Sequence, residues 1–404
     1  MALYRVSGKE NHMDNFMYHA PTRVVFGRDT ELETGKLIAN EGGSRVFLVY
    51  GGGSCVKSGL LARIESSLDQ AGLAYLEFGG AQPNPTLKHA EEGVRKALEF
   101  GADFILAVGG GSAIDTAKGI AHGTANPDTA LWDIWTGVKP LKQSMPVGCV
   151  LTIAAAGSEM SSSAVLTNKD LGIKKGLDTD FNRCRFAVMN PALLATVPKY
   201  QLAAGIADIM QHTMERYFIP NSHAELTDEI AEGLLRTVIR NGRKILADPN
   251  DYNAMAEVMW ASSLSHNWLT GLGRPGDFSV HKFGHALSAA YGATHGASLT
   301  AVWKAWADYL YETEPGRFAQ FARRVWGVDE AETLSAAREG IRCTTAYFRE
   351  IGMPVSLADL GVQPSEEEIH ALALNCTQNG KVTLSRIKPI GVSEAEEIFR
   401  AAKS

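Results

Sequence analysis

The segment FILAVGGGSAIDTAKGIAHG, residues 104–123, reads as a strand, a glycine loop and a helix in direct succession. The apolar run Phe104–Val108 predicts a buried strand, and the apolar spacing over Ser112–His122 predicts a helix. Gly109–Ser112 joins the two, and its serine is the expected N-cap of the helix. Asp115 and Lys118 fall on the first turns of that helix. A glycine loop between a strand and a helix is typical of nucleotide-binding α/β folds.

The same order of elements recurs through the first half of the chain. RVFLVYGGGS, residues 45–54, again combines an apolar strand with a Gly-Gly-Gly-Ser loop. Further expected strands are Ala74–Phe78, Pro146–Thr152 and Arg185–Met189, and further expected helices are Leu60–Ala71 and Leu87–Phe100. Alternation of this kind predicts a Rossmann-like α/β domain with a parallel sheet, over residues 13–198.

Two glycine loops in one α/β domain favour a dinucleotide as the ligand. Glycine lets the backbone approach a phosphate closely, and the following helix presents free N–H groups to the anion. The loops match neither GxGxxG nor the P-loop pattern GxxxxGK[ST], since Lys57 and Lys118 fall at the wrong offsets. We expect the pyrophosphate on the second loop. The alternative is that both loops are ordinary tight turns without a ligand.

Beyond Pro198 the apolar periodicity is helical, which predicts an all-α domain over residues 199–404 without strands. The expected helices are Glu225–Leu246, Tyr252–Leu272, Ser279–Ala290, Leu299–Tyr311, Arg317–Val325, Glu332–Ile351 and Glu366–Cys376. The expected boundary between the two domains lies near residues 197–200. Residues 1–12 have no continuous apolar stretch and are expected to form a loose extension, not a signal peptide.

An aspartate and several histidines lie at helical spacing in this second half. Asp208 and His212 are four residues apart in GIADIMQHTMERY and therefore share one helix face. His281 and His285 repeat the spacing, and His295 follows a turn. One carboxylate with several imidazoles suits zinc or ferrous iron, and the pattern is not the HExxH of zinc proteases. The other histidines are expected to be ordinary core or surface residues: His12, His19, His89, His122, His223, His266 and His370.

Composition excludes several classes of protein. The 404 residues include 39 Lys+Arg and 45 Asp+Glu, and the formal net charge of −6 argues against nucleic acid or an anionic membrane as partner. No apolar run approaches the ~20 residues of a membrane span. The five cysteines are far apart and form no C-x-x-C pair, which predicts a cytoplasmic protein without a disulfide framework.

Several segments resemble the iron-containing, or group III, alcohol dehydrogenase family. They are VGGGSAIDTAKGIA at 108–121, TIAAAGSE at 152–159, AAGIADIMQHTMERY at 203–217 and the block of His281, His285 and His295. The resemblance extends from Met13 to the C-terminus. NFMYHAPTRVVFG and LVYGGGS are most similar to the bacterial branch of NADPH-dependent butanol dehydrogenases and aldehyde reductases. The resemblance implies a dehydroquinate synthase-like architecture, with the active site between the two domains, and a homodimer.

The resemblance also implies the site residues. The metal ligands that match the family are Asp208, His212, His281 and His295. His285 matches an additional histidine close to the metal and the cofactor, and it is the expected proton-transfer residue. The implied cofactor contacts are Gly51, Gly52, Gly53 and Ser54 near the adenosine, Gly109, Gly110, Gly111, Ser112 and Asp115 at the pyrophosphate, and Thr152, Gly157 and Ser158 along the nicotinamide ribose. Lys174 matches the lysine that the family has on the cofactor side.

Cofactor choice is predicted from the first loop. Family members that prefer NAD carry an aspartate there, whereas Gly51–Ser54 leaves room for a 2′-phosphate, so NADP(H) is favoured. Glu77, at the end of a predicted strand, is the opposing signal for NAD. Ala156 stands where the family usually has a threonine that hydrogen-bonds the cofactor.

These features predict an oxidoreductase that transfers a hydride between NADP(H) and an aldehyde or primary alcohol, with iron or zinc polarising the substrate oxygen. Medium-chain substrates are expected by resemblance. A non-catalytic NADP- or metal-binding sensor, suggested by Ala156, remains open. An enzyme similar to dehydroquinate synthase or glycerol-phosphate dehydrogenase also remains open. It would need a basic pocket for a phosphorylated substrate, and only Lys282 and Arg274 lie near the histidine block to form one. Candidates for the substrate pocket are Trp260, Asn267, Trp268, Leu272 and Phe278.

Overall fold

A six-stranded parallel sheet forms the centre of the first half of the chain. The structure is a computed structural model and describes residues 12–220 and 223–404, so the expected extension lies outside it apart from His12. All neighbouring strands run parallel, which confirms the predicted α/β fold. In sheet order the strands are β1 (Arg23–Phe26), β8 (Phe186–Met189), β5 (Val147–Leu151), β4 (Phe104–Gly109), β2 (Arg45–Tyr50) and β3 (Ala74–Phe78).

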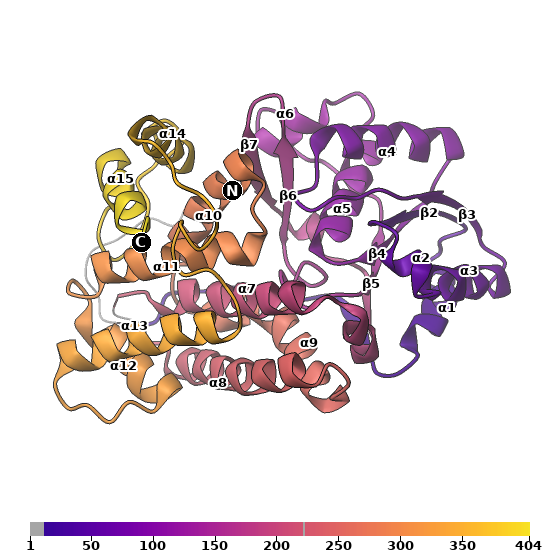
Figure 1. The fold of residues 1–404 in the computed structure, drawn as a ribbon. Helices are drawn as coiled ribbons and strands as arrows, with labels where there is room; N and C mark the ends of the chain where they lie inside the picture. Colours follow the sequence, from indigo (N-terminus) through magenta and orange to yellow (C-terminus); the bar gives the residue numbers. More distant parts are fainter. Residues whose placement is uncertain (1–11, 221–222) are drawn as a thin grey trace.

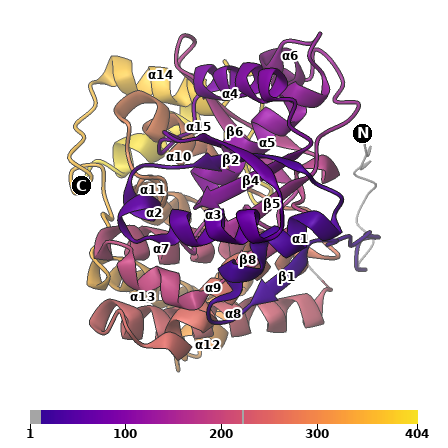
Figure 2. The ribbon, with the colours of Figure 1, turned by 90° about the vertical axis from the view of Figure 1, so that its right-hand side faces the viewer.

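Helices cover both faces of this sheet, because successive side chains of a strand point to opposite faces. In β2, Val46 and Leu48 pack into one core and Phe47 and Val49 into the other. Figure 2 shows α3 and α4 on opposite sides of β2. The helices on one face are α1 (Thr34–Asn40) and α3 (Leu60–Gln70), and those on the other are α4 (Leu87–Phe100) and α5 (Gly111–Ala125).

A β-hairpin beside the sheet was not predicted. It consists of β6 (Ser163–Asn168) and β7 (Ile173–Asp178), which pair antiparallel. β7 is mostly polar and only partly buried, and neither β6 nor the edge strand β1 has more than three consecutive apolar residues, so no long apolar run marks these strands. The short helices α2 (Ser54–Lys57) and α6 (Leu131–Thr136) were missed as well. The hairpin lies against α10 (Ser279–Tyr291) of the second half (Figure 1).

The helix after the second glycine loop differs from the prediction at its N-terminus. α5 begins at Gly111, its N-cap is Gly110, and no side chain caps it, so the assignment of Ser112 as N-cap was wrong. Ser112 lies in the first turn, where its carbonyl oxygen accepts a hydrogen bond from the Thr116 hydroxyl at 2.8 Å. Because glycine leaves the terminal N–H groups uncapped, they are available to an anion in the loop.

The second half is helical, as predicted. Beyond Pro198, the described residues contain only one isolated β-bridge, between Leu384 and Ile390. α7 is buried along most of its length, because other helices of the second half pack around it (Figure 1). None of the described helices has the length and apolarity that a membrane span needs. The helices are α7 (Lys199–Tyr217), α8 (Glu225–Ala247), α9 (Tyr252–His266), α10, α11 (His295–Leu310), α12 (Pro315–Trp326), α13 (Thr333–Glu350), α14 (Glu366–Cys376) and α15 (Val392–Ala401).

Two helix ends differ from the prediction and matter for the site. α9 ends at His266, six residues before the expected end, because a short 3-10 turn, Leu269–Gly271, follows it. α11 begins at His295, four residues before the expected start. As a result, both histidines lie at helix termini, from which their side chains face the space between the two halves.

Candidate active site

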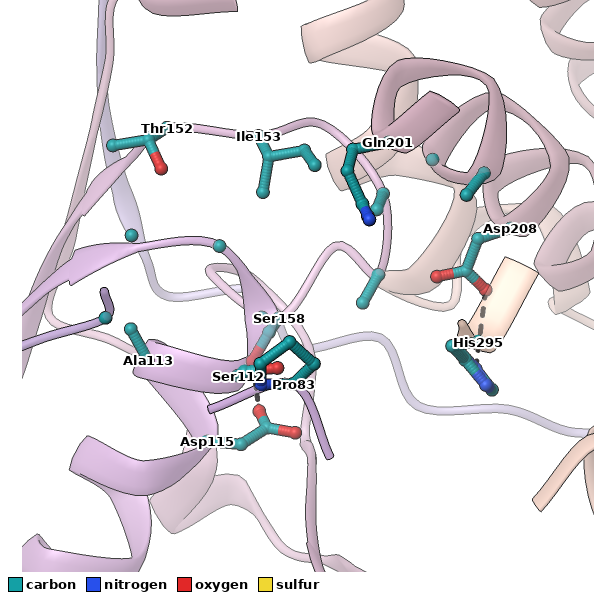
Figure 3. Close-up of a pocket in the computed structure, with 18 of the residues that line it drawn as sticks. Pro83, Ser112, Ala113, Asp115, Thr152, Ile153, Ser158, Gln201, Asp208 and His295 are labelled. Atoms are coloured by element: carbon teal, nitrogen blue, oxygen red, sulfur yellow. Dashed lines mark hydrogen bonds and ion pairs between the residues drawn. The ribbon is translucent and has the colours of Figure 1, made fainter. Parts of the chain in front are cut away.

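A cavity of about 1000 Å³ is lined by residues from both halves of the chain. Its wall includes the carboxyl ends of β2, β4 and β5, where ligands of open parallel sheets bind. Side chains from α7, α9, α10 and α11 complete the wall. Figure 3 shows Ser112, Asp115 and Ser158 on the sheet side, with Asp208 and His295 on the helical side.

Most of the predicted cofactor residues line this cavity. They are Gly51, Gly52, Ser54, Gly109, Gly110, Gly111, Ser112, Asp115, Thr152, Ser158 and Lys174. Gly53 and Gly157 are not part of the lining. Gly157 has φ 59°, and a Cβ at this position would approach the Ser262 carbonyl oxygen to 2.6 Å, so close packing against α9 already requires glycine there. Direct cofactor contacts of these residues stay predictions.

A buried hydrogen-bond network ties α5 to the loop before β6. Ser158 Oγ donates to Asp115 Oδ1 at 2.5 Å, and Lys118 Nζ donates to the carbonyl oxygens of Ser158 at 2.7 Å and Ser163 at 2.8 Å. Burial raises the pKa of Asp115, and the charge of Lys118 opposes that shift. Lys118 was not predicted from the sequence to belong to the site. Its spacing of one helical turn from Asp115 was the available signal.

Lys174 reaches the cavity from β7. Its Nζ donates to Asn84 Oδ1 at 2.9 Å. Burial lowers the pKa of Lys174 to about 8, although the carboxylates of Asp208 and Asp115 favour the charged form. This amine therefore changes its charge within the range in which many enzymes operate.

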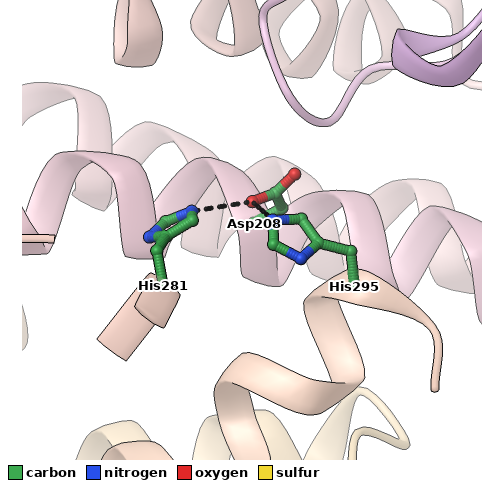
Figure 4. A group of neighbouring side chains, drawn as sticks. All are labelled: Asp208, His281 and His295. Atoms are coloured by element: carbon green, nitrogen blue, oxygen red, sulfur yellow. Dashed lines mark ion pairs between the residues drawn. The ribbon is translucent and has the colours of Figure 1, made fainter. Parts of the chain in front are cut away.

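Asp208 lies at the centre of the imidazole cluster. Its Oδ1 is 3.6 Å from Nδ1 of His212, from Nε2 of His281 and from Nε2 of His295. α7 supplies the carboxylate and His212, α10 supplies His281, and the first residue of α11 is His295. In Figure 4, His281 and His295 point at the same carboxylate. The structure thus brings together the four residues that were expected to be ligands.

The cluster fits a divalent metal ion. Buried polar atoms normally have hydrogen-bond partners, yet Asp208 Oδ1, His212 Nδ1, His281 Nε2 and His295 Nδ1 have none. Ligands about 2.1 Å from a tetrahedral zinc or iron lie about 3.4 Å from one another, similar to the 3.6 Å between Asp208 Oδ1 and a ring nitrogen of each histidine. Among the described residues, Asp208, His281 and His295 form a group whose ligand atoms lie within 4.8 Å of each other. His212, outside that group, stays a predicted ligand.

Glu215 is a site residue that the sequence analysis missed. Its carboxylate accepts hydrogen bonds from the backbone N–H of His281, at 3.1 Å, and from Nδ1 of the same residue. Burial lowers the pKa of His281, but Glu215 and Asp208 outweigh it and raise the pKa to about 9. Glu215 follows Asp208 and His212 on one face of α7, and this spacing was the available signal.

His285 lies beside the cluster. Its ring centroid is 5.4 Å from that of His295 and 6.2 Å from that of His281. Burial, together with the nearby Lys174, lowers the pKa of His285 well below its usual value, so the imidazole is neutral. It lines the cavity but does not belong to the group of ligand atoms around Asp208.

The substrate pocket differs from the expectation. Trp268 and Phe278 line the cavity, whereas Trp260, Asn267 and Leu272 do not, so their assignment to the pocket was wrong. Trp260 is on the surface against β1, and Asn267 is buried in the helical domain. Two further lining residues, Arg216 and His266, were not predicted. His266 was expected to be an ordinary histidine, because its contacts with α7 are tertiary and leave no pattern in the sequence.

A parallel-sheet domain with glycine loops that faces a carboxylate–histidine cluster in a helical domain is the arrangement of a two-domain oxidoreductase. The chain belongs to the iron-containing alcohol dehydrogenase family. The family description "Iron-containing alcohol dehydrogenase" matches residues 21–191, and "Fe-containing alcohol dehydrogenase family, C-terminal" matches residues 202–403. The chain is therefore an enzyme of alcohol and aldehyde oxidoreduction, and membership implies a nicotinamide cofactor and a divalent metal.

Relatives agree with the expected bacterial branch of butanol dehydrogenases and aldehyde reductases. The chain is 37% identical to NADH-dependent butanol dehydrogenase A of Clostridium acetobutylicum, over 96% of this chain and 99% of that one. It is 35% identical to the NADPH-dependent aldehyde reductase YqhD of Escherichia coli, over 97% and 100%. A crystal structure of NADH-dependent butanol dehydrogenase A from Thermotoga maritima superposes with TM-score 0.94 at 34% identity, covering 98% of this chain and all of that one.

Proposed function

We propose that the enzyme transfers a hydride between NADP(H) and an aldehyde or primary alcohol at a divalent metal, iron or zinc. The observation that carries this proposal is the continuity of one cavity from both glycine loops to the Asp208 cluster. A dinucleotide on the loops would point its nicotinamide toward the metal, as direct hydride transfer to a bound carbonyl requires.

Each residue in the cavity has a proposed task. Asp208, His212, His281 and His295 hold the metal, which supplies Lewis acidity to the substrate oxygen when bound. Uncapped N–H groups at the start of α5 bind the pyrophosphate. His285 is neutral and therefore able to take a proton from an alcohol through a ring nitrogen, and to return it in the direction of aldehyde reduction.

The preference for NADP(H) rests on the first glycine loop. Gly51–Ser54 contains no carboxylate that would repel a 2′-phosphate. Glu77, the residue that argues for NAD, does not line the cavity, and its carboxylate accepts a hydrogen bond from the Tyr50 hydroxyl at 2.9 Å. The relatives include enzymes named for either cofactor, so the loop geometry is the discriminating observation.

Three further expectations stay part of the proposal. Residues 13–198 and 199–404 would fold as two domains that meet near residues 197–200. The enzyme would be a homodimer. It would work in the cytoplasm, in keeping with five cysteines that are all unpaired in the structure.

The decisive experiment combines elemental analysis of the purified protein with absorbance at 340 nm, for butanal with NADPH or NADH. We expect about one equivalent of iron or zinc per chain and a higher kcat/KM with NADPH. Equal or better use of NADH would overturn the cofactor preference alone. A protein that binds the metal and the cofactor but oxidises neither NADPH nor NADH with any aldehyde would be the non-catalytic sensor. The enzymatic proposal would then be wrong.

A further inference from the structure

Glu159 is a fully buried carboxylate that the proposed function does not use. It ends the segment that follows β5, and its side chain reaches from the sheet half of the chain to the helical half. Oε1 accepts a hydrogen bond from the hydroxyl group of Ser263 on α9 at 2.5 Å. The part of the chain that the structure describes offers no partner to Oε2. Burial raises the pKa of Glu159, and a carboxylate in such surroundings is costly to bury.

Residues 154–159 pack directly against two helices of the second half. Ser262 Oγ of α9 donates a hydrogen bond to the carbonyl oxygen of Ala155 at 3.2 Å. A Cβ on Gly205 of α7 would approach the carbonyl oxygen of Ala154 to 2.2 Å. The segment therefore has no free space into which it could shift toward α7.

The same segment is fixed to the nucleotide-binding half. Ser158, the neighbour of Glu159, donates to Asp115 of α5 at 2.5 Å and accepts from Lys118 at 3.0 Å. In Figure 3 the chain runs from Thr152 toward the helical side. Four residues between the end of β5 and Glu159 line the cavity with their neighbour Ile153, namely Thr152, Ala155, Ala156 and Ser158. The segment is thus held between α5 and α9, next to the expected position of the nicotinamide ribose.

The other partner of this hydrogen bond, α9, extends to the predicted metal site. The helix ends at His266, three residues after Ser263, and the ring of His266 packs on His212 with 4.0 Å between centroids. The hydrogen bond of Glu159 therefore joins the segment beside the cofactor to the helix beside a predicted ligand. Hydride transfer needs reacting atoms about 3–3.5 Å apart, and a misplacement of about 1 Å can cost about 100-fold in rate. A short, buried contact between these two elements is suited to maintaining that separation.

We propose, on the basis of the proposed oxidoreductase function, that Glu159 is a positioning residue for hydride transfer, because its hydrogen bond with Ser263 fixes residues 152–158 relative to the metal cluster. Glu159 does not line the cavity, so it acts through this segment and not on the substrate or the cofactor. Its replacement should slow the hydride step and leave metal content and NADPH affinity unchanged. A contact that only stabilised the fold would change the Tm, but not the rate constant of the folded, metal-loaded enzyme.

The test measures single-turnover hydride transfer by absorbance at 340 nm, with metal-loaded enzyme in excess over NADPH and with saturating butanal. Glu159→Leu removes the acceptor and Ser263→Ala removes the donor, and we expect each to lower the rate constant about 10–100-fold. Glu159→Gln retains an oxygen that accepts from Ser263 and should keep most of the rate. NADPH with deuterium at the transferred position should slow the observed step in every variant, which identifies that step as hydride transfer.

Two controls separate positioning from the general effect of a buried substitution. The double variant Glu159→Leu plus Ser263→Ala should be no slower than the slower single variant, because both changes remove the same hydrogen bond. Glu232→Leu on α8 is the matched control. Glu232 is also buried, accepts from the Tyr217 hydroxyl at 2.7 Å and has one oxygen without a partner among the described residues, but it does not line the cavity. Its variant should transfer the hydride as fast as the wild type.

The outcomes distinguish this inference from the function on which it rests. Unchanged hydride transfer in Glu159→Leu and Ser263→Ala would overturn the inference, as would a loss that arises entirely from weaker binding of metal or NADPH. An equal loss in Glu232→Leu would overturn it as well. If Glu159→Leu does not fold, the milder Ser263→Ala decides. All these results leave aldehyde reduction intact, whereas a wild-type protein that reduces no aldehyde with either cofactor would refute the proposed function and this inference with it.

Discussion

Nδ1 of His281 donates a hydrogen bond to the carboxylate of Glu215, and this contact turns Nε2 of the same ring toward Asp208, 3.6 Å away. The carboxylate fixes the ring orientation and the tautomer of His281, a predicted metal ligand, and raises its basicity. Glu215 and Asp208 lie on the same helix, α7. One rigid element therefore positions both the predicted ligand Asp208 and the carboxylate that orients His281.

Replacement of Glu215 should therefore weaken metal binding without removing a ligand. We expect Glu215→Ala to lower the metal affinity about 10–100-fold, the usual cost of losing an orienting partner, and Glu215→Gln to have a smaller effect because its amide oxygen still accepts. Competition with a chelator measures the affinity. Glu225→Ala, on the exposed start of α8, is the matched control. Equal metal affinity in all four proteins would contradict this role.

Metal removal should destabilise the protein, since the polar atoms of the cluster then stay buried without partners. Metal at about 100 times its Kd stabilises a folded protein by about 2.7 kcal/mol, so calorimetry should give a clearly lower Tm for the chelated enzyme. Asp208→Ala removes the central ligand and should make the Tm insensitive to added zinc or iron. A metal-dependent Tm that persists in this variant would locate the metal elsewhere.

Close contact between α7 and α11 should be needed to align the ligands. Gly296 follows His295, and a Cβ at this position would overlap the carbonyl oxygen of Ala204 on α7. We expect Gly296→Ala to lower the free energy of unfolding by about 1–3 kcal/mol, and to weaken metal binding because α11 must move away from α7. Gly316→Ala is the control: α12 has open space there, and alanine should be neutral or slightly stabilising. Thermal unfolding and metal titration of both variants provide the comparison.

The parts of the fold that could be predicted are those in which local pattern and tertiary burial coincide. β2 and β4 are buried on both faces, so their sequences are continuous apolar runs that no surface constraint interrupts. The β6–β7 hairpin forms because it packs beside α5 and α10. Its short strands mix polar and apolar residues and contain no long apolar run that would predict them.

The same distinction applies to the site. Asp208 and His212 were predictable because they lie four residues apart on one helix. This spacing puts a carboxylate and an imidazole on the same face, where both can reach one metal ion. Glu215, Arg216 and His266 were not, because their contacts depend on how α7, α9 and α10 pack against each other. Ser112 was misassigned because a serine after three glycines looks like an N-cap, whereas Gly110, in an extended conformation, is itself the N-cap and the helix begins at Gly111.

Cofactor binding should depend on pH through Lys174. Its amine is charged below its pKa of about 8, and the charged form attracts the cofactor phosphates. The Kd of NADPH, measured by fluorescence titration, should therefore be constant below pH 8 and rise by up to tenfold per pH unit above it. Lys174→Met should weaken binding at pH 7 and abolish the rise. Lys175→Met, the neighbouring residue of β7 that does not line the cavity, should behave as the wild type.

Ala156 should limit the affinity for the cofactor. It lines the cavity next to the second glycine loop. A Cβ added to Gly111 would lie 3.2 Å from the Cβ of Ala156. Ala156→Thr adds a hydroxyl next to the predicted pyrophosphate site, and one additional hydrogen bond should tighten NADPH binding about 2–10-fold. Ala156→Val, which has the same shape without the hydroxyl, should not tighten it. If the two variants bind NADPH equally, the added hydroxyl does not reach the cofactor, and the cofactor does not approach the loop at Ala156 as proposed.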